Sequence, residues 1–224
     1  MQEYTQDSAG VPGVAEAGDQ FGYSLAADGI SLSTNTPHDV AVGSPGEDIG
    51  AAKDAGSVTV FADLPTGWKV IAALSQDTAG VAGVTETGDR FGHSLAMQPK
   101  ANGLASPELI VSSPYEDIGA AKDAGAVAAF VVGASAVKPA ALYTESTART
   151  PGTMATGNRF GLAVGAAHGV RENLFTVSSP YQGDGSVFVV SGRTTRSWAP
   201  GKGGIPASTT GTFGWSVASG PGIS

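Results

Sequence analysis

The residues with the clearest chemical potential are carboxylates in a loop that occurs twice. Glu47 and Asp48 open the segment Glu-Asp-Ile-Gly-Ala-Ala-Lys-Asp-Ala-Gly, and Glu116 and Asp117 open a nearly identical copy. Adjacent carboxylates could form an acidic rim that binds cations or a basic partner. The alternative is a solvated hairpin loop in which the lysine of each copy partly neutralises the acids. We favour this structural interpretation.

Aromatic side chains occupy two further repeated positions. Tyr115 and Tyr181 each follow the proline of a Ser-Ser-Pro segment. The position after a repeated Phe-Gly pair is occupied by four different residues, namely Tyr23, His93, Leu162 and Trp215. Aromatic residues at loop tips suit the anchors of an interface. Packing of these rings against a neighbouring repeat is the structural alternative, so both interpretations stay open.

The residue types and their spacing give little indication of catalysis. His38, His93 and His168 lie at different positions of the repeat, so their spacing implies no metal cluster. No nucleophile elbow, phosphate-binding loop or zinc-protease motif occurs. We therefore predict no catalytic residue. An enzyme that assembles its site from distant loops is the alternative.

Composition narrows the class of partner. The formal net charge of the 224 residues is −8. Nucleic acid is an unsuitable partner because phosphate binding requires clustered Lys and Arg. There is no cysteine, which excludes disulfides and thiolate metal sites. No apolar run is long enough to span a membrane. The low charged fraction of 14% is typical of exported β-proteins, so we expect an extracellular or cell-surface location although Met1–Tyr4 lacks signal-peptide features.

The elements that position these residues belong to an internal repeat. Gly18-Asp19-Gln20-Phe21-Gly22 recurs from Gly88 and from Gly157, and a shorter copy contains Phe213-Gly214. The Phe-Gly pairs are 70, 69 and 53 residues apart. We divide the chain into repeats of about 6–75, 76–144 and 145–208 and a partial repeat of 209–224, all within one region.

Each repeat carries the pattern of short strands. In the first, the ranges 21–27, 39–43, 57–61 and 69–74 are rich in β-forming residues and are bounded by Gly, Pro, Asn or Asp. Val58 and Val60 alternate with Ser57 and Thr59, as in a half-buried strand. The second and third repeats show matching strands at 109–112, 126–131, 174–177 and 186–190. The sequence therefore predicts an all-β protein with four antiparallel strands per repeat.

The repeat resembles the FG-GAP repeat of integrin α-subunits and their bacterial relatives. Phe21-Gly22-Tyr23-Ser24-Leu25-Ala26 is a near-ideal form of the first landmark, and a Gly-Ser-Pro or Ser-Ser-Pro segment follows about twenty residues later. The Pro-Tyr-Glu-Asp-Ile-Gly segment is similar to secreted actinobacterial members. The resemblance covers residue 6 to about 190. It implies that the repeats are β-propeller blades, three complete and one partial.

The same resemblance raises the possibility of calcium. Family blades usually carry an Asp-x-Asp-x-Asp-Gly loop, and calcium needs six to eight oxygen ligands. The first repeat retains only Asp28 and Asp39 at this point. We therefore favour a hydrogen-bonded turn over a calcium site and expect no other cofactor.

The function that this combination implies is binding. We expect a non-catalytic, integrin-α-like binding or assembly module for a protein or a surface glycan. The alternative is an enzyme with its active site at the central mouth of an assembled propeller. A propeller needs about four to eight blades. We therefore expect either a homo-oligomer, detectable by light scattering, or one part of a longer chain.

Overall fold

The chain folds into three separate antiparallel sheets, one for each complete repeat. The computed structural model describes residues 3–27, 39–98, 108–133, 135–147, 153–168, 173–191, 195–207 and 211–218. Within these ranges all regular structure is β, and every sheet has four strands. The predicted all-β class and the four antiparallel strands per repeat are confirmed.

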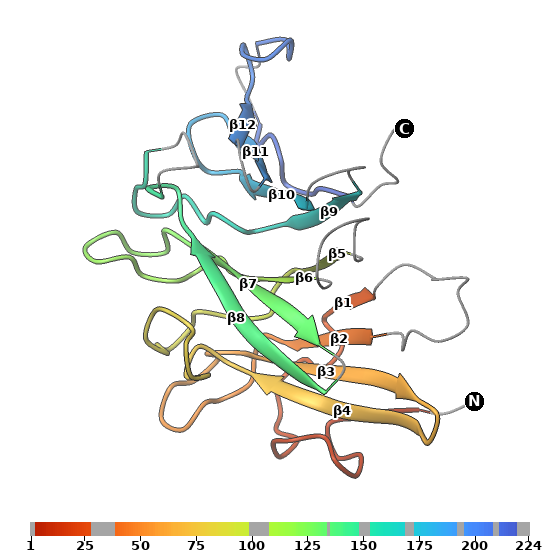
Figure 1. Ribbon diagram of the computed structural model, residues 1–224. Helices are drawn as coiled ribbons and strands as arrows, with labels where there is room; N and C mark the ends of the chain where they lie inside the picture. The colour runs from red at the N-terminus through yellow and green to blue at the C-terminus, as the bar shows by residue number, and fades with distance from the viewer. Residues whose placement is uncertain are drawn as a thin grey trace.

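Strand order follows the chain in every sheet (Figure 1). The first sheet contains β1 (Ser24–Ala27), β2 (Asp39–Ser44), β3 (Ser57–Leu64) and β4 (Gly67–Leu74). The second contains β5 (Leu95–Gln98), β6 (Glu108–Ser113), β7 (Ala126–Gly133) and β8 (Ala136–Tyr143). The third contains β9 (Val164–His168), β10 (Asn173–Ser179), β11 (Ser186–Ser191) and β12 (Thr195–Trp198).

The first strand starts later than the sequence predicts. We expected it to cover 21–27, but β1 begins at Ser24. Gly22 has a φ of 89°, and the amide of Tyr23 donates to the carbonyl oxygen of Gln20 at 2.9 Å. The Phe-Gly pair therefore forms a tight turn, and pairing with β2 starts only beyond it.

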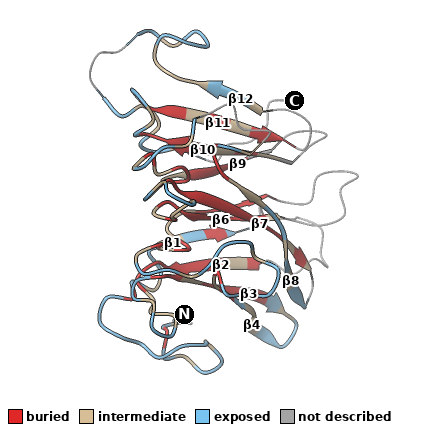
Figure 2. Ribbon diagram, turned by 90° about the vertical axis from the view of Figure 1, so that its left-hand side faces the viewer, coloured by how far each residue is buried: buried red, intermediate tan, exposed pale blue. Residues whose placement is uncertain are grey.

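Apolar layers fill the two spaces between the sheets, and the strands hold most of the buried residues (Figure 2). Phe91 packs edge-on against Phe130 between the first and second sheets, with ring centroids 6.2 Å apart. Phe160 and Phe188 lie 5.6 Å apart between the second and third sheets. Phe91 and Phe160 thus fill the layer between their own sheet and the preceding one.

Neighbouring sheets contact each other mainly through their first strands. β1 lies against β5 and β5 against β9, whereas contact between the last strands β4 and β8 is slight. The outer face of the first sheet is left uncovered by the described part of the chain at β1. Leu25 is 65% exposed there, whereas the equivalent Leu95 and Val164 are 8% and 5% exposed.

A backbone clasp joins each repeat to the next. The carbonyl oxygens of Ala55, Ala124 and Asp184 accept hydrogen bonds from the amides of Phe91, Phe160 and Phe213, respectively. The donor–acceptor distances are 2.8, 2.9 and 3.0 Å. Phe213-Gly214 of the partial repeat is therefore held on the third sheet as a complete repeat would be.

The clasp requires glycine on its acceptor side. Gly56, Gly125 and Gly185 have φ values of 89°, 87° and 98°, a region that favours glycine. A Cβ atom at any of them would collide with the backbone of the clasped phenylalanine. The glycine that ends each duplicated loop is thus explained by close approach of two backbones.

The described part of the chain contains no helix that is long and apolar enough to cross a membrane.

Candidate functional site

The residue before each Phe-Gly pair has an unusual backbone conformation. Gln20, Arg90 and Arg159 have φ values of 59°, 56° and 53°. Such left-handed backbone costs an ordinary residue roughly 1–2 kcal/mol. Its recurrence at one repeat position shows that the turn geometry imposes it. In the second and third repeats this turn presents an arginine to the tyrosine that follows the Ser-Ser-Pro segment.

These arginines and the repeated aromatic residues form a continuous row. Tyr23 and His93 have ring centroids 5.2 Å apart, and His93 and Tyr115 are 6.1 Å apart. At the other end Tyr181 and Trp215 are 6.0 Å apart. We call the following set the aromatic ladder: Tyr23, Arg90, His93, Tyr115, Arg159, Tyr181 and Trp215. The ladder extends across all three complete repeats and the partial one.

Arg159 connects the two halves of the ladder. Its guanidinium carbon lies 4.8 Å from the ring centroid of Tyr115 and 4.9 Å from that of Tyr181. Arg90 lies 5.5 Å from the same Tyr115 ring. Arginine over an aromatic face is held by cation–π attraction of about 0.5–2 kcal/mol. In the first repeat Gln20 and Gly46 replace this arginine and tyrosine, so the ladder begins at Tyr23.

The ladder is exposed at its ends and half-buried in its middle. Tyr23 is 53% exposed, Tyr181 37% and Trp215 58%. The hydroxyl of Tyr23 lies 3.4 Å from Nε2 of His93. Burial, and then the nearby charge of Arg90, lower the pKa of His93, whereas a backbone hydrogen bond with Leu162 opposes this shift. His93 is therefore neutral at pH 7. Its ring can pack against both Tyr23 and Tyr115 without adding charge.

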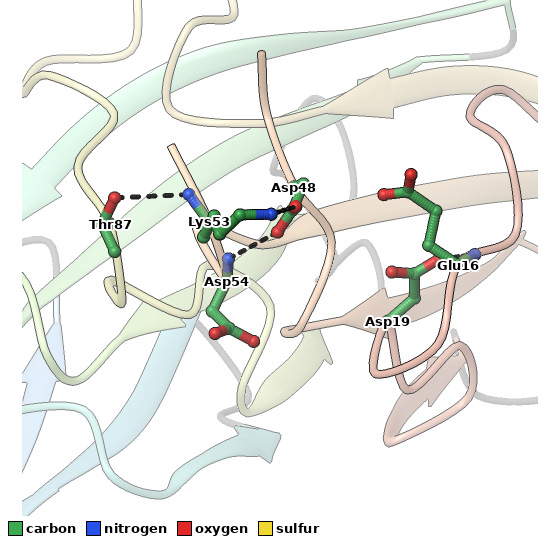
Figure 3. Close-up of polar contacts among 6 residues, drawn as sticks. All are labelled: Glu16, Asp19, Asp48, Lys53, Asp54 and Thr87. Atoms are coloured by element: carbon green, nitrogen blue, oxygen red, sulfur yellow. Dashed lines mark hydrogen bonds and ion pairs between the residues drawn. The ribbon is translucent and has the colours of Figure 1, made fainter. Parts of the chain in front are cut away.

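The duplicated loop divides its carboxylates between surface and interior. Asp48 pairs with Lys53 (Oδ2–Nζ 2.7 Å), and its other oxygen accepts a hydrogen bond from the amide of Asp54 (Figure 3). The amide of Lys53 donates to Thr87 of the next repeat at 3.3 Å. Asp117 makes the same two contacts in the second copy, with Lys122 and the Asp123 amide. Each of these acids thus closes its own loop.

The other two acids of the predicted rim point inward. Glu116 is only 4% exposed and accepts a hydrogen bond from the side-chain amide of Gln76. Glu47 accepts the equivalent bond from Gln6 and is half-buried. The four acids therefore do not form one exposed rim. Asp48 and Asp117 are paired within their own loops, whereas Glu47 and Glu116 bond to glutamines outside them.

A second carboxylate, that of Asp89, lies beside Glu116. Asp89 is 2% exposed and is hydrogen-bonded to Glu116. Burial, and then the charge of Asp89, raise the pKa of Glu116 to about 8. Burial raises the pKa of Asp89 to about 6, although the Glu86 amide opposes the shift by donating to Oδ2 at 2.7 Å. The pair therefore retains a proton near neutral pH.

The structure describes one of the two residues considered as calcium ligands. Asp28 lies outside the described residues, and Asp39 is the first residue of β2 and is 6% exposed. Among the described residues no three His, Cys, Asp or Glu side chains are grouped closely enough to hold a metal ion.

A polar hollow lies at the edge of the third sheet. It has a volume of about 370 Å³, and its lining includes Asp184, Ser186, Ser197 and Lys202. No histidine lines it. A Ser–His pair is therefore missing from this hollow.

Sequence reasoning identified the ladder's aromatic residues but missed the two arginines. The available signal was the recurrence of Arg directly before Phe-Gly in the second and third repeats. It also missed the buried cluster of Gln76, Asp89 and Glu116. The recurring Gln-Asp and Gly-Asp pairs were visible, but nothing showed that they meet.

No protein-family model matches this chain, and no curated protein is significantly similar to it in sequence.

Proposed function

We propose that the three sheets are blades of a propeller of the FG-GAP type and that the chain is a non-catalytic binding module. The aromatic ladder would contact a protein or a surface glycan. Support for blades comes from the contact pattern, because sheets that radiate from an axis meet mainly through their first strands.

The ladder is the observation that carries the binding role. Interface hot spots are enriched in Trp, Tyr and Arg, and the ladder contains one Trp, three Tyr and two Arg. Contacts between successive members fix the side chains before a partner arrives, so binding costs less side-chain entropy. The exposed rings of Tyr23, Tyr181 and Trp215 provide flat apolar faces that suit either a sugar ring or an apolar side chain.

The test is a binding screen with ladder variants. The purified chain would be applied to a printed glycan array and to an array of surface-protein ectodomains. We expect Tyr23→Ala, Tyr181→Ala and Trp215→Ala each to weaken binding of any ligand found by about tenfold or more. Val84→Ala is the matched control, because Val84 is 70% exposed and lies outside the ladder.

The proposal fails if neither array yields a ligand, or if affinities of the ladder variants equal that of Val84→Ala. Fluorescence of Trp215 gives an independent readout, since a ligand on the ladder should change its emission. Trp215→Phe separates that signal from the other two tryptophans.

A further inference from the structure

The cluster around Glu116 fastens both ends of one loop. Residues 75–94 connect β4 to β5, and we call residues 75–92 of this connection the leader loop. Gln76 lies near its start and Asp89 near its end, whereas Glu116 enters from the loop between β6 and β7. Glu116 accepts from Gln76 and shares a hydrogen bond with Asp89. The exposed fractions of the three side chains are 6%, 2% and 4%.

The hydrogen bond between Asp89 and Glu116 requires a proton. An ionised carboxylate has no donor, so two carboxyl groups bond directly only when one of them is protonated. The charged groups that face the pair are Glu86 and Asp117, and both are acidic. These neighbours disfavour a second negative charge in the cluster.

In the third repeat the corresponding buried carboxylate is hydrogen-bonded without a shared proton. Glu145 stands in place of Gln76 and Asn158 in place of Asp89, with the same separation of 13 residues. Asn158 and Ser179 both donate to the Glu145 carboxylate. An amide is close in shape to a protonated carboxyl group. Asn158 thus shows that an amide at the position of Asp89 bonds to a buried glutamate without a shared proton.

We propose that Gln76, Asp89 and Glu116 form a proton-dependent lock that holds the leader loop on the second sheet. Loss of the shared proton leaves two buried negative charges in contact and pushes the loop away from Glu116. The first repeat carries a looser version, in which Glu47 is half-buried and lies near the charge of Asp19. The lock does not depend on what the aromatic ladder binds.

The direction of the pH effect follows from the folded-state protonation. The pKa of Glu116 is raised from 4.5 to about 8 and that of Asp89 from 3.8 to about 6. The folded state therefore binds more protons than the unfolded state between about pH 4 and pH 8. Stability from the lock is complete below the unfolded pKa values and is lost as pH rises through about 8.

Release of the lock has a local consequence. The end of the leader loop carries Arg90, next to Asp89, and is followed directly by His93. Because both belong to the aromatic ladder, alkaline pH loosens the middle of the ladder before it unfolds the sheets. The second repeat is thus a pH-sensitive part of the surface.

Hydrogen exchange at pH 6 and pH 9 tests the lock, after correction for the intrinsic pH dependence of exchange. We expect protection of residues 80–92 to fall on the order of tenfold in the unmodified chain. Asp89→Asn and Glu116→Gln should each abolish this fall, because an amide then replaces the shared proton. Asn158→Asp should install a new fall in residues 153–161.

Two results would overturn the proposal. One is a fall in the protection of residues 80–92 that is as large in a folded Asp89→Asn or Glu116→Gln variant as in the unmodified chain. The other is an unchanged profile at 153–161 in a folded Asn158→Asp chain. Urea unfolding at both pH values measures the effect on global stability. We expect the unmodified chain to be less stable at pH 9 than at pH 6, and the Glu116→Gln variant to be equally stable at both.

Discussion

The residue before Phe-Gly has left-handed backbone in all three complete repeats, but only in the second and third does its side chain stack on a tyrosine. Arg90 and Arg159 occupy this conformation and stack on Tyr115. Gln20 occupies it too, but Gly46 of its repeat offers no ring. In the first repeat the strain therefore brings no stacking energy, whereas in the third it places a guanidinium between two rings.

Glycine substitution should distinguish the two cases. Gln20→Gly relieves the positive φ, and we expect unfolding to become harder by about 0.5–1 kcal/mol once the extra entropy of unfolded glycine is counted. Arg159→Gly gives the same relief but loses two ring contacts, so its net effect should be zero or destabilising. Urea denaturation measures both, and a stabilised Arg159→Gly chain would mean that the stack contributes little.

Charge retention gives a second test of the stack. Arg159→Lys keeps the positive charge but removes the planar group, because lysine is a compact ammonium. We expect a loss of about 0.5–1 kcal/mol and greater exposure of the tyrosine rings. Tyrosine fluorescence and thermal unfolding would show it. Lys69→Arg, the reverse change on β4, is the control and should leave both unchanged.

At the scale of the element, the clasp explains why glycine follows Asp-Ala in the duplicated loop. Gly125 and Gly119 both have positive φ, 87° and 62°. A Cβ atom on Gly125 would collide with the backbone of Phe160, whereas one on Gly119 would meet open space. The two positions therefore share backbone strain and differ only in crowding.

Alanine at these two glycines should give different losses of stability. We expect Gly119→Ala to cost about 1 kcal/mol from strain alone. Gly125→Ala should cost at least about 1 kcal/mol more, because a backbone contact between repeats must separate. Chemical denaturation of the two variants provides the comparison, and equal losses would show that the clasp tolerates a side chain.

Much of the sheet structure could be predicted from sequence because turn residues and alternation are local signals. The alternation of Val58 and Val60 with polar residues predicts β3 directly. No strand was predicted over β8, which contains Pro139. Pro139 is tolerated because β8 is an edge strand and pairs with Phe130 beside a bulge. The aromatic ladder and the buried acids could not be predicted in this way, since their members come together only through packing between loops distant in sequence.

At the scale of the whole molecule, the three sheets are not equally protected. The second sheet is covered on both faces, whereas the first has an uncovered face at Leu25. In a stack of repeats, stability depends on the interfaces that each repeat shares with its neighbours. The middle of the chain should therefore open last.

Hydrogen exchange at pH 6 should follow this order. We expect the slowest amides in β6 and β7 and faster exchange in β2 and β3, where one neighbour is missing from the described chain. Leu109→Ala in the middle sheet should speed exchange in all three sheets, while Leu25→Ala should change little because its side chain is largely exposed. Uniform protection would instead indicate a single cooperative unit.

Each buried acid cluster lies within a single repeat, and this determines which repeat boundaries keep the cluster intact when a repeat is duplicated. Gln76, Asp89 and Glu116 all fall within 76–144, and Glu145, Asn158 and Ser179 all fall within 145–208. A boundary placed just before a sheet would separate Gln76 from Glu116 and bring mismatched acids and amides together. Tandem duplication or shuffling therefore preserves a working set only when leader loop and sheet move together. Such copying lengthens the stack by one whole sheet at a time, and each new sheet brings its own glycine and phenylalanine for the next junction.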